Sequence, residues 1–204
     1  MRGADRLVAE LRGRVADERV LSAVRDVPRD VFVPADLRAD AWANEPLPIG
    51  CGQTISQPLV VARMCELLEL DGSERVLDVG TGSGYHAALL GRLAAEVYSI
   101  ELHPELSDRA ARALAAAGAQ NVTLAVGDGS QGLPAHAPYD AINVAAAARG
   151  RIPAALIEQL APGGRLVAPV EERGDQYLAL LREDHGELRT TRLERVRFVP
   201  LVSS

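Results

Sequence analysis

Three acidic residues stand at or near the ends of three short apolar runs in the middle of the chain. They are Asp78, near the end of residues 75–79, Glu101, directly after residues 96–100, and Asp128, shortly after residues 122–126. Carboxylates accept hydrogen bonds from hydroxyl and amino groups. At the carboxyl ends of adjacent parallel strands, they could accept both hydroxyls of a ribose and the amino group of an adenine. The spacing therefore predicts a nucleoside pocket.

A glycine-rich turn, Gly80-Thr81-Gly82-Ser83-Gly84, follows the first of these runs. Its glycines permit a tight turn and let a ligand lie against the backbone, in the strand–turn–helix context that such a site needs. The third glycine comes one residue earlier than in the dinucleotide fingerprint. Asp78 would repel a pyrophosphate but favour the sulfonium and ammonium of S-adenosylmethionine. We therefore expect S-adenosylmethionine as cofactor. An NAD-linked oxidoreductase and a non-catalytic cofactor-binding module are the alternatives from other functional classes.

Alternating strands and helices must position these residues. We expect strands at residues 75–79, 96–100, 122–126, 140–145, 165–170, 176–182 and 194–199, and helices at 85–94, 104–117 and 152–160. This alternation predicts an α/β fold of the doubly wound, Rossmann-like class I methyltransferase type. Its sheet would have seven mostly parallel strands and end in an antiparallel hairpin strand.

The N-terminal part of the chain has a different pattern. Apolar residues at helical spacing over residues 5–26 predict a helical segment that Pro28 and Pro34 end. Residues 40–56 resemble a loop, and a helix with Pro58 in its first turn is expected over 56–70. We expect one methyltransferase domain over residues 1–204. Residues 1–70 would form a helical, substrate-covering segment, and residues 71–204 the Rossmann-like core.

Composition narrows the class of protein. The net charge is −6, aromatic residues make up 3%, and all 22 basic residues are arginine. The densest basic stretch, residues 189–197, is interrupted by Glu194, so we expect no nucleic-acid partner. The two cysteines, Cys51 and Cys65, form no disulfide framework and lack the spacing of zinc ligands. No apolar run is long enough to span a membrane. We expect a cytoplasmic, monomeric enzyme that uses no metal and binds no membrane.

Six segments carry a resemblance to a known family. They are Val27–Pro34, Leu47–Gly50, Gly52–Pro58, Gly80–Tyr85, Gly127–Gly129 and Val196–Leu201. In this order the chain resembles the protein-L-isoaspartate O-methyltransferase family over about residues 5–202, with Gly-Gln-Thr-Ile-Ser-Gln-Pro as the most specific segment. The resemblance implies methyl transfer to the free α-carboxylate of L-isoaspartyl residues in damaged proteins or peptides, which starts repair through a succinimide.

The resemblance also implies roles for individual residues. Ser56 would be the catalytic residue, as a donor that orients the acceptor, and Ile55, Ala146 and Val199 would hold the isoaspartyl unit. Ser56 alone could instead cap a helix beginning near Gln57. The cofactor would be bound by Thr54, Asp78, Gly80, Thr81, Gly82, Ser83, Gly84, Glu101, Leu102, Asp128 and Gly129.

One loop departs from the family pattern. In residues 143–153, Ala145 stands where the family has Thr or Gly, an expected proline is absent, and one residue appears extra. Drift in a tolerant loop explains this. Alternatively, the acceptor is altered, with Arg149 or Arg151 pairing with a substrate carboxylate. The closest rival function is methylation of an aspartate in one dedicated, biosynthetic peptide. His86 also replaces a more usual residue, and we expect it to pack rather than to transfer protons.

Overall fold

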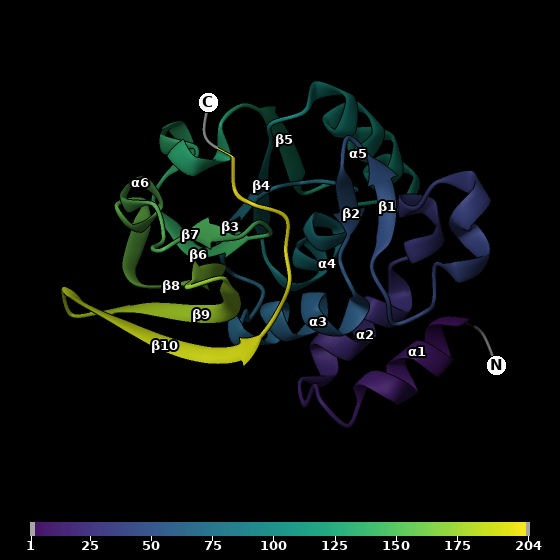
Figure 1. The fold of residues 1–204 in the computed structure, drawn as a ribbon, viewed down its shortest axis with the longest axis horizontal. Coiled ribbons are helices and arrows are strands. Elements are labelled where there is room, and N and C mark those ends of the chain that lie inside the picture. Colours follow the sequence, from purple (N-terminus) through teal and green to yellow (C-terminus); the bar gives the residue numbers. More distant parts are fainter. Residues whose placement is uncertain (1–2, 203–204) are drawn as a thin grey trace.

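The computed structural model describes residues 3–202, and a central sheet dominates it (Figure 1). Its main path runs β10-β9-β8-β6-β3-β4-β5, and the two-residue strand β7 pairs with β8. The strands are β3 (Arg75–Val79), β4 (Glu96–Glu101), β5 (Val122–Val126), β6 (Tyr139–Val144), β7 (Ala148–Arg149), β8 (Leu160–Glu172), β9 (Asp175–Asp184) and β10 (Glu187–Arg195). Pairing is parallel from β5 to β8 and antiparallel at β8–β9 and β9–β10. The predicted mostly parallel sheet that ends in an antiparallel hairpin is therefore confirmed.

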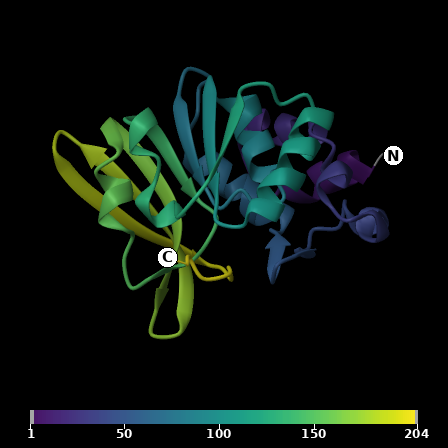
Figure 2. The same cartoon turned by 90° about the horizontal axis from the view of Figure 1, so that it is seen from above.

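Layers of apolar side chains cover both faces of this sheet. Successive residues of a strand point to opposite faces, and accordingly Val76 belongs to one core cluster while Leu77 belongs to the other. The first cluster packs under α4 (Tyr85–Leu93), α5 (Pro104–Ala116) and the N-terminal helices, which lie on one side of the sheet (Figure 2). The second packs under α6 (Ala154–Ile157). The sheet is thus wound on both faces, as its alternating sequence predicts.

The last strand differs from its prediction over residues 194–199. His185 and Gly186 form a two-residue turn with positive φ angles of 52° and 87°, and Glu187 pairs with Asp184 directly after it. The strand therefore starts at Glu187, in a polar stretch that hydrophobicity alone does not reveal because it lies exposed at the sheet edge. Residues 196–202, here called the C-terminal strap, leave the sheet and cross its carboxyl-end side (Figure 1).

The N-terminal part forms two helices, α1 (Gly3–Leu11) and α2 (Glu18–Asp26), where one helical segment was expected. Asp17 caps α2 by accepting a hydrogen bond from the backbone N–H of Arg19 at 2.8 Å. Two 3₁₀ turns follow, η1 (Arg29–Phe32) and η2 (Ala35–Asp40). Apolar residues of both helices join the same core cluster as α4. This part therefore packs directly on the sheet's helical layer.

Residues 40–56 were predicted to be a loop, but they are not loop throughout. They contain a short hairpin, β1 (Leu47–Gly50) and β2 (Gln53–Ile55), which precedes α3 (Pro58–Leu67). Residues 50–52 all have positive φ angles, so the chain reverses over very few residues. Hydrophobicity alone does not reveal strands of three and four residues. No helix within residues 3–202 is long and apolar enough to cross a membrane.

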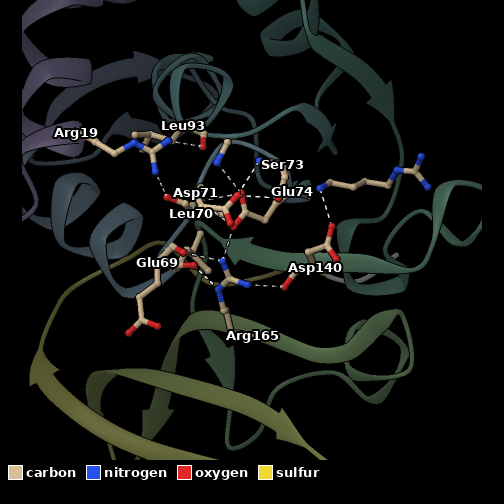
Figure 3. A network of polar contacts seen from close by, with 12 residues as sticks. Arg19, Glu69, Leu70, Asp71, Ser73, Glu74, Leu93, Asp140 and Arg165 are labelled. Atoms are coloured by element: carbon tan, nitrogen blue, oxygen red, sulfur yellow. Dashed lines mark hydrogen bonds and ion pairs between the residues drawn. The ribbon is translucent and has the colours of Figure 1, made fainter.

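A polar network fastens the amino-end edge of the sheet, away from the strands' carboxyl ends (Figure 3). The buried carboxylate of Glu74 accepts hydrogen bonds from the backbone N–H of Asp71 at 2.9 Å and from the guanidinium of Arg165 at 2.8 Å. Arg165 also donates to the carbonyl of Glu69 at 2.9 Å. Since ligands of such sheets bind at the carboxyl edge, we interpret this network as structural.

Candidate active site

A pocket opens at the carboxyl ends of β3 and β4, beside the loop that follows β6. Its empty space, mouth included, is about 810 Å³. The lining residues are Gln53–Ser56, Val61, Val79–Ser83, Tyr85, His86, Ile100–His103, Gly129, Ala145, Ala146 and Val199–Val202. In the sheet, β3 lies between β4 and β6, so the strands that follow β3 are added first on one side of it and then on the other. Such a switch point is where open α/β sheets bind their ligands.

The glycine-rich turn forms one wall of this pocket. Gly80 has a φ of 92° and faces Ala145 across the crevice, where an added Cβ would lie 3.7 Å from the Ala145 side chain. Gly84 lies outside the lining and faces α5 instead. A Cβ there would lie 3.2 Å from that of Ala110. The turn thus offers bare backbone to a ligand at Gly80, whereas Gly84 allows two helices to approach.

Glu101 lies in the wall next to the turn and is 5% exposed. One carboxylate oxygen accepts a hydrogen bond from the backbone N–H of Gly82 at 2.7 Å, and the other accepts one from the N–H of His103 at 3.0 Å. A carboxylate has about four acceptor positions. Glu101 therefore fixes the turn and still has acceptor capacity for ligand hydroxyls.

Asp78 lies beneath the pocket and not in its lining. It is fully buried and accepts hydrogen bonds from Ser99 Oγ and Asn143 Nδ2, both at 2.7 Å. Ser99 Oγ lies 2.6 Å from Thr81 Oγ1, so Asp78 is linked to the turn through one hydroxyl. Burial raises the pKa of Asp78 to about 6. This carboxyl group is placed to support the turn rather than to contact a ligand.

His86 lines the pocket from the first turn of α4. Its Nδ1 lies 3.2 Å from Asn143 Nδ2, and the same amide nitrogen donates to Asp78. Burial lowers the pKa of His86 to about 3, so the ring is neutral near pH 7. The expectation that it packs agrees with this placement. The link through Asn143 was not foreseen, because it depends on the pairing of β6 with β3, which places Asn143 beside Asp78.

Asp128 was expected to contact the cofactor, but its neighbour Gly129 lines the pocket instead. The Asp128 side chain accepts a hydrogen bond from the Ser130 N–H at 2.9 Å and begins the 3₁₀ turn η3 (Gly129–Gln131). Gly129, but not Asp128, lines the pocket. An added Cβ on Gly129 would lie 2.6 Å from Val79 Cγ1. The backbone therefore comes very close to the end of β3 at this point.

The opposite wall consists of β2, residues 145–146 and the strap. Thr54, Ile55, Ser56, Ala146 and Val199 all line it, so these sequence-predicted residues are brought together. The helix α3 begins at Pro58 and Gln57 occupies its N-cap position. Ser56 is therefore not the cap residue.

Arg29 is a functional candidate that sequence reasoning did not single out, although it lies inside one of the family-like segments. It is fully buried, and its guanidinium donates to the carbonyls of Ala41 at 2.8 Å and Ser56 at 3.0 Å. The guanidinium carbon lies 4.7 Å from the centre of the Tyr85 ring. Burial lowers the pKa of Arg29 to about 10, so it remains protonated near pH 7. Its sequence signal was an Arg-Asp pair between Pro28 and the apolar run that begins at Val31.

The sequence profile of one family, protein-L-isoaspartate(D-aspartate) O-methyltransferase, matches residues 2–204. The chain belongs to this family. A protein-L-isoaspartate O-methyltransferase of Methanoculleus marisnigri is 53% identical over 194 residues, which are 95% of this chain and 88% of that protein. The resemblance inferred from the sequence segments is therefore confirmed.

Solved structures of similar proteins agree with this family. One protein-L-isoaspartate O-methyltransferase superimposes with a TM-score of 0.88 at 26% identity, over 97% of this chain. This chain spans 65% of that longer one. A Plasmodium falciparum structure assigned to the same enzyme superimposes with a TM-score of 0.86 at 25% identity, over 100% of both chains. That structure is a complex with S-adenosyl-L-homocysteine.

Proposed function

We propose that this chain transfers the methyl group of S-adenosylmethionine to the free α-carboxylate of L-isoaspartyl residues in damaged proteins or peptides. The resulting methyl ester initiates repair through a succinimide. The observation that carries this function is the juxtaposition of two walls in one pocket, one with Glu101 and the glycine-rich turn, the other with Ser56 and the strap. The relatives named for this activity favour general repair over methylation of one dedicated peptide.

The chemistry of the lining suits a positively charged donor. The described lining residues include Glu101 but no arginine, and His86 is neutral near pH 7. A dinucleotide would bring a pyrophosphate to this wall without an arginine or lysine to pair with it. S-adenosylmethionine supplies a methyl group on a positively charged sulfur.

Several predicted cofactor residues border the donor in this proposal. They are Thr54, Gly80, Thr81, Gly82, Ser83, Glu101, Leu102 and Gly129. The other three predicted cofactor residues act indirectly. Asp78 supports the glycine-rich turn, Gly84 allows the contact between α4 and α5, and Asp128 holds the η3 turn. Glu101 would accept the ribose hydroxyls, since each of its oxygens accepts one backbone hydrogen bond and keeps a further acceptor position.

The acceptor needs orientation more than activation. A carboxylate has an unperturbed pKa of about 4 and is ionised near pH 7, so its attack requires no general base. An oxygen–carbon bond forms as the carbon–sulfur bond breaks, and holding these atoms in line supplies much of the acceleration. In our proposal, Ser56 donates a hydrogen bond that orients the acceptor. The apolar side chains of Ile55, Ala146 and Val199 exclude water from it.

The N-terminal part has a covering role in this proposal. Residues 3–70 contribute Thr54, Ile55 and Ser56 to the pocket, and Arg29 fastens their backbone. We further propose that the enzyme acts as a monomer on isoaspartyl proteins.

The test is methyl transfer from donor with a labelled methyl group to an isoaspartyl peptide beside its normal-aspartate twin. We expect label only on the isoaspartyl peptide, released as methanol by mild base. The Glu101→Ala variant should lose at least 100-fold in kcat/KM. Equal labelling of both peptides, or calorimetric binding of NAD in place of S-adenosylhomocysteine, would overturn the proposal.

A further inference from the structure

A second groove lies directly beside the pocket. It is lined by Ser130, Ala148, Arg149, Arg151, Pro153 and residues 200–202, and is here called the flanking groove. It shares residues 200–202 of the strap with the pocket. We propose that the flanking groove binds a carboxylate-bearing residue next to the isoaspartyl residue of the acceptor, through Arg149 and Arg151. This inference rests on the proposed function, because it concerns the peptide that enters the pocket.

Backbone hydrogen bonds hold the two sides of this groove together. The N–H of Ala147 donates to the carbonyl of Val199 at 2.8 Å, and the N–H of Leu201 donates to the carbonyl of Ala147 at 2.8 Å. Next to this pairing, β7 pairs in parallel with the end of β8, so that Arg149 lies beside Glu171. The altered loop is therefore an ordered border of the strap, and its two arginines stand at fixed places along it.

The charges of the flanking groove are unbalanced. Its described lining contains two arginines and no carboxylate. Neither guanidinium makes a hydrogen bond or ion pair within residues 3–202. The arginines of β10 differ, since Arg189, Arg192 and Arg195 each pair with a carboxylate. In a chain of net charge −6, two unpaired cations beside the acceptor wall attract an anionic group.

The geometry points to a neighbour of the methylated residue as the source of this anion. Val199 lines the pocket, and the flanking groove begins at Pro200 on the same strap. An extended peptide advances about 3.3 Å per residue, so a peptide that leaves the pocket over the strap reaches the arginines within a few residues. Exposed ion pairs are individually weak. Two arginines should therefore give a preference of about three- to tenfold, not an absolute requirement.

The experiment compares isoaspartyl peptides that differ only at the two positions on each side of the isoaspartyl residue. These positions carry alanine in the first peptide, glutamate on the N-terminal side in the second, and glutamate on the C-terminal side in the third. We expect kcat/KM to be about three- to tenfold higher for one of the glutamate peptides than for the alanine peptide. This ratio should approach one in 0.5 M salt, because salt screens exposed charges.

Two double variants test the assignment of the preference. Arg149→Gln with Arg151→Gln should abolish the ratio, and Arg149→Glu with Arg151→Glu should invert it. The matched control is Arg173→Gln with Arg189→Gln, which removes the same charge from exposed positions outside both cavities and should keep the wild-type ratio. Thermal unfolding of each variant checks that it is folded.

The outcomes separate the two proposals. If the wild-type enzyme methylates the alanine peptide but shows no glutamate preference, or if the glutamine variant keeps the preference, the flanking groove has no such role and the proposed function stands. If no isoaspartyl peptide is methylated, the proposed function fails and this inference fails with it.

Discussion

Arg29→Met should destabilise the protein and slow methyl transfer. Methionine replaces the aliphatic stem of arginine but not its guanidinium, so a small void forms and the carbonyls of Ala41 and Ser56 lose their donors. A third, longer bond to the Glu45 carbonyl at 3.4 Å is lost as well. Hydrogen bonds to charged groups contribute about 1.5–3 kcal/mol each, so the two shorter bonds represent about 3–6 kcal/mol. Methionine avoids the desolvation of a buried cation, which offsets part of this loss.

We therefore expect the free energy of unfolding in urea to fall by about 2–4 kcal/mol. For a chain of this size that corresponds to roughly 4–16 °C in Tm. Because Arg29 fastens the Ser56 backbone, kcat/KM for an isoaspartyl peptide should fall even at temperatures where the variant is fully folded. Arg25→Met is the matched control, since Arg25 is 44% exposed on α2 and should change the free energy of unfolding by less than about 0.5 kcal/mol. A loss below 1 kcal/mol in Arg29→Met would refute the reasoning.

Three further predictions concern the floor and walls of the pocket. Glu101→Gln places an amide N–H against a backbone donor, so the affinity for S-adenosylhomocysteine, measured by calorimetry, should fall about 10- to 100-fold; unchanged affinity would contradict the role of this carboxylate. Burial raises the pKa of Asp78 from 3.8 to about 6, so between these values the folded state binds more protons than the unfolded state, and stability falls as pH rises. The difference in unfolding free energy between Asp78→Asn and wild type should therefore rise by about 3 kcal/mol from pH 3 to pH 7. If urea titrations show the same difference at every pH, the raised pKa of Asp78 is excluded. Gly129→Ala forces a Cβ to within 2.6 Å of Val79 and should cost about 1–3 kcal/mol in unfolding free energy. In contrast, Gly127→Ala, with its nearest contact at 3.4 Å, should cost less, and equal costs for the two would count against this packing.

The strands that lead to the pocket could be predicted from sequence because their apolar residues both favour a strand and are buried in the fold. Residues 75–79 are a short apolar run that ends at the glycine-rich turn, and β3 has those bounds. The strand β5 also has its predicted bounds, 122–126, although it lies at the edge of the sheet. The glycine-rich turn and Glu101 could be placed for the same reason, since they come directly after such strands. Buried parallel strands leave a strong hydrophobic signal.

The elements that the sequence did not reveal depend on contacts between distant segments. The exposed edge strand β10 and the hairpin of β1 and β2 are held by pairing and turn conformation, which a hydrophobicity pattern does not record. Arg29 became a candidate only when Ala41 and Ser56 were seen around it. Asp78 was predicted to bind the cofactor because it precedes the turn. Its hydrogen-bond partners are instead Ser99 and Asn143, which belong to neighbouring strands and are distant in the sequence.

The pairing of Ala147 with the strap uses main-chain atoms only. Side chains on either side of it can therefore be exchanged without breaking the bonds that hold the rim together. Random replacement of residues 149 and 151 would then yield a set of equally well-folded enzymes that differ in which damaged sequences they methylate fastest. This rim is a natural starting point for directing a repair enzyme toward one chosen protein.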